Sequence, residues 1–198
     1  SGLGVDTTLV YRGDKILRGF DHDLRHGLAD EMHERGIRFR YGYHITRLDK
    51  DGQGVCVSFS NGEQATFDAV MFATGRHPNT KGLGLSEVGV ELDQTGAIVV
   101  DSYSRSTVPN IYAVGDVTGR AALTPVAIRE GAAFAQTVYN GTPTEVPYDL
   151  IPTAVFSEPE IGTVGLSEVA AAERYRSVDV YLTRFRPMIN TLSDRQER

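Results

Sequence analysis

The spacing of apolar residues along this 198-residue chain predicts helices and strands in alternation. Residues 7–11 are rich in β-branched and apolar side chains, which is typical of a strand. Apolar side chains at four-residue spacing predict a helix over residues 21–35, which Asp21 can cap and Gly36 can end. A second short strand is expected at residues 37–41.

Turn signals divide the next part of the chain into short strands. Residues 45–48, 55–59 and 65–67 are expected to be antiparallel, because Asp-Gly and Asn-Gly dipeptides between them favour hairpin turns. Apolar runs predict three further single strands, at residues 69–73, 153–157 and 178–186. Residues 88–92 and 97–100 are expected to form another hairpin.

The stretch from residue 110 to 141 carries the most informative pattern. Residues 111–114 form an apolar run that suits a buried parallel strand, and Asp116 follows at its carboxyl end, where open α/β sheets bind ligands. Thr124 and Pro125 predict the start of a helix, with threonine as the N-cap and proline in the first position. The N-terminus of such a helix stabilises an anion. The apolar side of this helix is expected to comprise Val126, Ile128, Ala132, Ala135 and Val138.

Composition narrows the classes of function. The content of 40% hydrophobic and 23% charged residues is ordinary for a globular protein, and a net charge of −6 argues against a general nucleic-acid binder. No apolar run approaches membrane-spanning length, so we expect a cytoplasmic protein without a membrane partner. Cys56 is the only cysteine, which excludes an internal disulfide, and the histidines show no metal-ligand spacing, so no metal is predicted.

The sequence AVGDVTG followed by LTPVAIREG resembles the second flavin-contacting segment of the pyridine-nucleotide disulfide reductases. Within that family the motifs are most similar to those of the glutathione reductase branch. The resemblance implies an α/β flavoprotein with two Rossmann-like dinucleotide-binding domains and mixed sheets, followed by the start of an α+β dimerisation domain. It implies that Asp116 holds a ribityl hydroxyl of FAD and that the helix start at Thr124 contacts the flavin. The alternative is a Gly-Asp turn before an ordinary helix.

The loop YRGDKILRGFD also matches this family, and it contains Arg12 and Arg18. In a dinucleotide domain the end of the second strand meets the adenosine ribose, where arginine accommodates the 2′-phosphate of NADP. Two guanidinium groups can hold one phosphate from different sides. The resemblance therefore implies NADPH as the second cofactor, and the alternative is a pair of solvated arginines.

Four further positions are implied by the family register. ATGRHPNT resembles the crossing out of the NADPH domain, so Gly75 and Arg76 are expected near that cofactor; the alternative is a plain interdomain turn. Backbone at Ala122 and Ala154 is expected to face the nicotinamide. For Ala154 the alternative is an ordinary buried strand residue.

The resemblance divides the chain into three parts: residues 1–76 as the second part of the NADPH-binding domain, 77–146 as the second FAD-domain segment, and 147–198 as the start of the dimerisation domain. No Gly-x-Gly-x-x-Gly turn, redox cysteine pair or His-Glu acid–base pair is present in the sequence. We therefore expect a fragment that is inactive alone and contains no catalytic residue.

The implied parent enzyme is an NADPH-dependent flavoprotein that reduces glutathione disulfide and acts as a homodimer. Ala132 stands where some glutathione reductases have an arginine for a glutathione carboxylate, so a trypanothione-type disulfide is an alternative substrate. A related flavoprotein acting on mercuric ion or oxygen is a further alternative. A non-enzymatic nucleotide-binding or assembly module is the alternative from another class.

Overall fold

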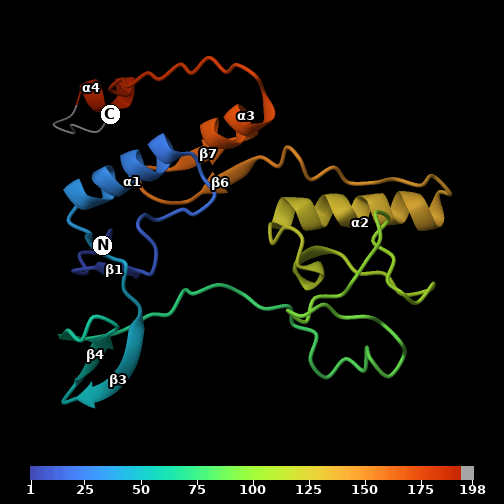
Figure 1. Cartoon of the computed structure of the whole chain (residues 1–198), viewed down its shortest axis with the longest axis horizontal. Coiled ribbons are helices and arrows are strands. Elements are labelled where there is room, and N and C mark those ends of the chain that lie inside the picture. The colour runs from blue at the N-terminus through green and yellow to red at the C-terminus, as the bar shows by residue number, and fades with distance from the viewer. Residues whose placement is uncertain (193–198) are drawn as a thin grey trace. The chain divides into compact units, whose positions relative to one another are not determined.

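The computed structural model describes residues 1–192, which form two compact units along the chain (Figure 1). The first unit comprises Ser1–Met71 together with the part of the chain from Pro152 onward, and the second comprises Phe72–Ile151. Each unit has its own cluster of buried apolar side chains. Among the described residues, no helix has the length and apolarity that crossing a membrane requires.

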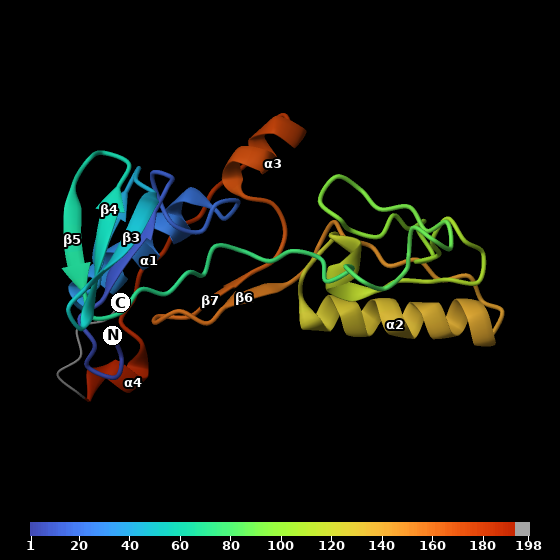
Figure 2. The same ribbon diagram turned by 90° about the horizontal axis from the view of Figure 1, so that it is seen from below.

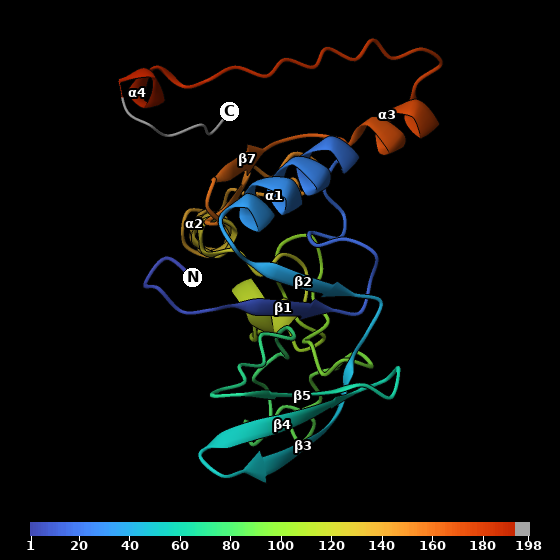
Figure 3. The same ribbon diagram turned by 90° about the vertical axis from the view of Figure 1, so that its left-hand side faces the viewer.

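The first unit begins with a strand–helix–strand motif, as predicted. Strands β1 (Thr8–Tyr11) and β2 (Arg38–Tyr41) are parallel, and helix α1 (His22–Glu34) connects them. Figure 3 shows α1 running alongside this pair of strands. Leu28 and Ala29 of the helix are buried together with Ile16, which belongs to the loop after β1. Ile16 therefore anchors this loop to the core, while other residues of the loop remain exposed.

The predicted antiparallel sheet is also present in the first unit (Figure 2). Strands β3 (Ile45–Asp51), β4 (Gly54–Phe59) and β5 (Gln64–Phe67) pair in that order through two tight turns. Val57 and Phe59 on the central strand are almost fully buried, since the alternation of the strand directs them to one face.

The C-terminal part of the first unit consists of short elements. Strands β6 (Thr153–Val155) and β7 (Ile161–Thr163) form an antiparallel pair, followed by helices α3 (Glu168–Arg174) and α4 (Met188–Thr191). Ile161 of β7 packs against the core cluster beside α1. The N-cap of α1, Asp21, also accepts a hydrogen bond from the first residue of α3, so α1 and α3 share one carboxylate.

The second unit is organised around one long helix, α2 (Thr124–Tyr139), preceded by a single 3₁₀ turn, η1 (Gly115–Thr118). Its core consists of Val90, Ile98 and Ala113 from the irregular chain before the helix. Isolated antiparallel bridges, such as that between Leu92 and Ile98, connect parts of this irregular segment.

Three predicted strands are not formed, and the predicted hairpin is reduced to a bridge. Residues 69–73 and 178–186 have no strand conformation, and residues 111–114 contribute only an isolated antiparallel bridge between Tyr112 and Arg105. Of the hairpin at 88–100, only the bridge pairing and its turn remain. A strand requires a neighbouring strand for its backbone hydrogen bonds, and no described strand lies alongside these apolar runs. Met71 and Tyr181 are accordingly highly exposed.

The details of α2 also differ from the prediction. Leu123 is the N-cap, without a side-chain hydrogen bond, and Thr124 is already helical. The buried face comprises Val126, Glu130 and Ala133, whereas Ile128 is 69% exposed. Glu130 is buried on this face, where an apolar residue was expected. It can be buried because its carboxylate accepts a hydrogen bond from the backbone N–H of Gly115, outside the helix.

Candidate functional site

The loop after β1 carries the two predicted phosphate-binding arginines. Arg12 directly follows the last residue of the strand, and the N–H of Gly42 fixes the backbone there by donating to the carbonyls of Tyr11 and Gly13, both at 3.0 Å. Arg12 is therefore located at the carboxyl end of a parallel strand, the edge at which open α/β sheets bind nucleotides.

Arg18 lies in a tight turn at the far end of the same loop. The N–H of Phe20 donates to the carbonyl of Leu17 at 3.1 Å, which closes a four-residue turn. Gly19 occupies the third position with a φ of 92°, a value that a type II turn requires and that glycine adopts without strain. The structure thus places both arginines on one loop, six residues apart in sequence.

Both guanidinium groups are exposed and form no hydrogen bond or ion pair with any described residue. Neighbouring arginines behave differently, because Arg38 pairs with Asp6 at 2.7 Å and Arg40 with Glu63 at 2.8 Å. Arg12 and Arg18 therefore keep all their donors available, as a phosphate site requires.

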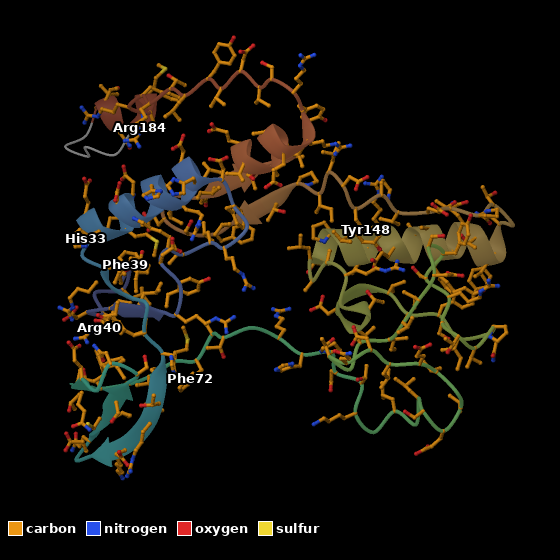
Figure 4. The ribbon with its side chains drawn as sticks, viewed as in Figure 1. His33, Phe39, Arg40, Phe72, Tyr148 and Arg184 are labelled. Atoms are coloured by element: carbon orange, nitrogen blue, oxygen red, sulfur yellow. The ribbon has the colours of Figure 1, made fainter. Side chains whose placement is uncertain are left out.

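A hollow of about 590 Å³ in the same unit contains neither arginine. It lies between α1 and β2, where its lining includes His33, Phe39 and Arg40 (Figure 4). The cations Arg38 and Arg40 on its wall are already paired with carboxylates, and the charge of Lys15 on the same wall is balanced by that of Asp30, so this hollow offers little net charge to an anionic ligand.

Asp116 lies in the 3₁₀ turn before α2, and the backbone of this turn is tied to the helix. The N–H of Gly115 donates to Oε2 of Glu130 at 2.6 Å, and Glu130 is only 1% exposed. Gly115 has a φ of 75°, and an added Cβ would meet the Cβ of Ala127 at 3.1 Å, so only glycine lets the turn approach α2 this closely. The carboxylate of Asp116 is thus presented from a fixed backbone.

Glu130 was missed by the sequence interpretation. It occurs at the spacing of the buried helix positions Val126 and Ala133, and a single acidic residue within such a stripe is a signal that could have identified it. Its second oxygen, Oε1, accepts a very short hydrogen bond from the hydroxyl of Tyr148, which lies on the segment that follows α2 (Figure 4). Two donors therefore satisfy the buried carboxylate.

Tyr148 is itself held by Arg120. Nη1 of Arg120 donates to the tyrosine oxygen at 3.2 Å, and the guanidinium lies 5.5 Å from the ring centre. Partial burial and the hydrogen bond to Glu130 raise the pKa of Tyr148 above its ordinary value, although Arg120 acts in the opposite direction. The hydroxyl therefore stays protonated at neutral pH and remains a donor to Glu130.

Arg76 and Asp116, both predicted site residues, are brought together. Nη1 of Arg76 lies 3.1 Å from Oδ2 of Asp116, with side-chain exposures of 79% and 46%. An ion pair this exposed contributes little energy, so it can open or share its oxygens with a hydroxyl donor. Oδ1 of Asp116 makes no hydrogen bond to a described residue.

The remaining predicted residues are placed as follows. Gly75 directly precedes Arg76 in an irregular exposed segment with a φ of 112°. Ala122 and Thr124 are exposed at the start of α2. Ala154 belongs to β6 in the other unit, where it pairs with Gly162 and is exposed, so it is not the buried strand residue of the alternative interpretation.

Comparison with known proteins identifies the family. The model of the pyridine nucleotide-disulphide oxidoreductases matches residues 1–131, and the model of the dimerisation domain of these proteins matches residues 151–198. The chain therefore belongs to the pyridine nucleotide-disulphide oxidoreductase family, as the sequence motifs indicated.

Curated relatives include glutathione and trypanothione reductases. The chain is 49% identical to the glutathione reductase of Burkholderia cepacia over its whole length, and it spans 44% of that protein. It is 44% identical to the trypanothione reductase of Trypanosoma congolense over 96% of the chain, which corresponds to 39% of that protein. The chain thus spans less than half the length of these relatives.

A solved structure supports the predicted fold class. The Cu(II) complex of the HOCl-induced flavoprotein disulfide reductase RclA from Escherichia coli superposes with a TM-score of 0.81 at 26% identity, covering 86% of this chain and 39% of that one. The α/β flavoprotein fold with the start of a dimerisation domain is therefore confirmed.

Proposed function

We propose that the full-length protein is an NADPH-dependent FAD flavoprotein that reduces glutathione disulfide to glutathione. The observation that carries this proposal is the loop after β1, which offers two exposed, unpaired guanidinium groups and no carboxylate at position 12. An acidic residue there would favour NADH, whereas arginine favours the 2′-phosphate of NADPH. The relatives that are named glutathione reductases support the choice of substrate.

The residues of the second unit fit FAD. Asp116 has a free carboxylate oxygen for a ribityl hydroxyl. At the start of α2, which no side chain caps, the N–H of Thr124 has no partner among the described residues, and the positive end of the helix dipole would favour negative charge on the flavin. FAD held by these residues would supply two-electron redox chemistry between NADPH and a disulfide. We assign Gly75, Arg76, Ala122 and Ala154 to backbone or charge contacts with the nicotinamide cofactor, in line with the family register.

A trypanothione-type disulfide is the second candidate substrate. Ala132 is exposed on α2 and cannot supply the guanidinium that holds a glutathione carboxylate in some relatives of this family. The trypanothione reductase relative, at 44% identity, gives independent support. Initial rates of NADPH oxidation with each disulfide at equal concentration separate the two candidates.

The experiment that tests the proposal uses the purified full-length protein. We expect a bound flavin absorbance spectrum and oxidation of NADPH that depends on glutathione disulfide. Asp116→Ala should weaken flavin binding by roughly 1.5–3 kcal/mol, because a charged acceptor is lost. Asp149→Asn, at an exposed carboxylate of the same unit, is the matched control. Equal flavin retention by the two variants through gel filtration would count against the role of Asp116.

The same proposal includes the arrangement of the full-length protein. We propose a homodimer, supported by the match to the dimerisation domain, and a division at residues 76 and 146 into NADPH-binding, FAD-binding and dimerisation segments. We also propose a cytoplasmic location. Sedimentation of the full-length protein and fractionation of the source cells test these points.

A further inference from the structure

Arg25 on α1 holds the loop that lies between Arg12 and Arg18. Its Nε donates to the carbonyl of Ile16 at 2.8 Å, and its Nη2 donates to the carbonyl of Lys15 at 2.8 Å. Nη2 also lies 3.3 Å from Oδ1 of Asp14. One guanidinium group therefore contacts residues 14, 15 and 16, which are the centre of the loop.

These contacts depend on the shape of the arginine side chain. Two nitrogens of one rigid plane reach two successive carbonyls, which a single ammonium nitrogen on a flexible stem does not reproduce. The side chain of Arg25 is only 16% exposed, so its hydrogen bonds are largely protected from competition by water. Asp14 is 86% exposed and adds little to the anchoring.

The loop needs such an anchor because its backbone is strained. Leu17 has a φ of 54°, in the left-handed region that residues with a side chain seldom adopt. A conformation of this kind persists only where the surrounding structure holds it. The residues just before Leu17 are held in place, because Ile16 is buried and Arg25 binds the carbonyls of residues 15 and 16. Arg18 directly follows Leu17, so its position depends on this anchored backbone.

We propose that Arg25 is a positioning residue for recognition of the NADPH 2′-phosphate, and that it sets the placement of Arg18 relative to Arg12 without touching the nucleotide. The inference rests on the proposed function, since it assumes that Arg12 and Arg18 bind this phosphate. A pre-organised pair of cations loses less entropy on binding than a pair on a mobile loop. Loss of the anchor therefore weakens the binding of NADPH. The binding of NADH, which lacks the phosphate, stays unaffected.

The test measures steady-state kinetics of the full-length protein with NADPH and with NADH. Arg25→Gln should raise the KM for NADPH by roughly tenfold, about the effect of losing one charged hydrogen bond to the phosphate. The KM for NADH and the kcat with either cofactor should stay as in the wild type. Arg25→Lys should raise the KM for NADPH as Arg25→Gln does, because lysine keeps the charge but lacks the two nitrogens that reach both carbonyls.

Three further variants make the outcome decisive. Asp14→Asn removes the ion pair and keeps the carbonyl contacts, so the KM for NADPH should change by less than about threefold. Arg47→Gln controls for loss of a cation, because Arg47 on β3 pairs with Asp49 and with no other carboxylate among the described residues. Arg12→Ala tests the phosphate site itself.

The results separate the inference from the function on which it rests. Full recovery with Arg25→Lys would show that charge alone suffices and would overturn the positioning role. Equal losses with NADPH and NADH would show that Arg25 only supports folding, and would overturn it too. A wild-type KM for NADPH in Arg25→Gln, together with a raised one in Arg12→Ala, would refute the inference alone. No effect of Arg12→Ala would refute the proposed phosphate site and with it the inference.

Discussion

At the scale of single residues, the proposed preference for NADPH over NADH rests on Arg12 and Arg18. NADPH differs from NADH by one phosphate, which carries close to two negative charges and three acceptor oxygens at neutral pH. Arg12 and Arg18 are the exposed, unpaired cations at the end of β1 and in the turn beyond it. Under the proposed function, discrimination between the two cofactors depends on these free donors.

We predict that Arg12→Ala and Arg18→Ala in the full-length protein each raise the KM for NADPH. A charged hydrogen bond is worth about 1.5–3 kcal/mol, which corresponds to roughly ten- to a hundredfold in affinity. The KM for NADH should remain nearly unchanged, and the effect on NADPH should decrease at high salt, which screens exposed charges. Steady-state kinetics at two ionic strengths measure both. Equal losses with the two cofactors would mean that these arginines support folding instead.

At the scale of elements, one carboxylate connects two helices of the first unit. Oδ1 of Asp21 accepts from the N–H of Asp23 at 3.0 Å, and Oδ2 accepts from the N–H of Glu168 at 2.8 Å. The hydrogen bonds from Glu168 and then Asp23 hold the pKa of Asp21 below its ordinary value. The charged form is therefore favoured in the folded state.

We predict that Asp21→Ala lowers the local free energy of opening of α1 and α3 by roughly 0.5–2 kcal/mol at pH 7, the usual effect of losing an N-cap. Because the folded pKa is depressed, this contribution is present above the unfolded pKa, near 3.9, and is lost as the pH falls through the folded pKa. Hydrogen–deuterium exchange of the two helices measures it. Asp23→Ala, at an acidic residue that caps nothing, is the control, and an equal change in both variants would refute the shared cap.

Helix α2 depends on a buried carboxylate that receives both of its donors from outside the helix. Glu130 accepts from Gly115 and from Tyr148, which join the turn before α2 and the segment after it to the same side chain. A buried acceptor that loses its donor costs about 1–3 kcal/mol. This network therefore couples the placement of Asp116 to the stability of the second unit.

Removal of one hydroxyl tests this network. We predict that Tyr148→Phe destabilises the full-length protein by about 1–3 kcal/mol, because Oε1 of Glu130 loses its donor while the ring remains. Thermal or urea unfolding measures the change. Tyr139→Phe, at an exposed tyrosine of α2, provides the comparison, and a stability of Tyr148→Phe equal to that of this control would contradict the prediction.

The sequence predicted the elements whose partners are close along the chain, and it failed where the partner is distant or lacking. The strands of the β3–β5 meander are joined by short turns, and β1 and β2 are joined by one helix, so periodicity and turn dipeptides define them. The apolar runs at 69–73 and 111–114 look equally strand-like, but no described strand pairs with them, and the second run forms only one bridge, from Tyr112 to Arg105. For the site, Arg12, Arg18 and Asp116 came from motifs. Glu130 could have been noticed as the one acidic residue at the buried spacing of α2, but its partners Gly115 and Tyr148 could not, and the carbonyl contacts of Arg25 follow from no local pattern.

At the scale of the whole molecule, the described units hold the residues that we propose contact the cofactors, but they hold only one thiol. Cys56 is partly buried in β4, between the strands that pair with it on both sides. Reduction of a disulfide substrate needs two electrons, and a protein that relays them through its own disulfide needs two cysteines. The 198-residue chain contains one.

We therefore predict that the 198-residue chain alone does not reduce disulfides with NADPH, whereas the full-length protein does. The physical reason is the electron count, since a single thiol cannot close an intrachain disulfide. NADPH oxidation with added FAD and glutathione disulfide, followed at 340 nm, measures this for both proteins. Cys56→Ser in the full-length protein is the matched control and should keep wild-type activity, because this thiol lies partly buried within the β3–β5 sheet and has no second cysteine of this chain to pair with. Activity in the isolated chain that disappears in its own Cys56→Ser variant would contradict the prediction and make Cys56 a redox residue.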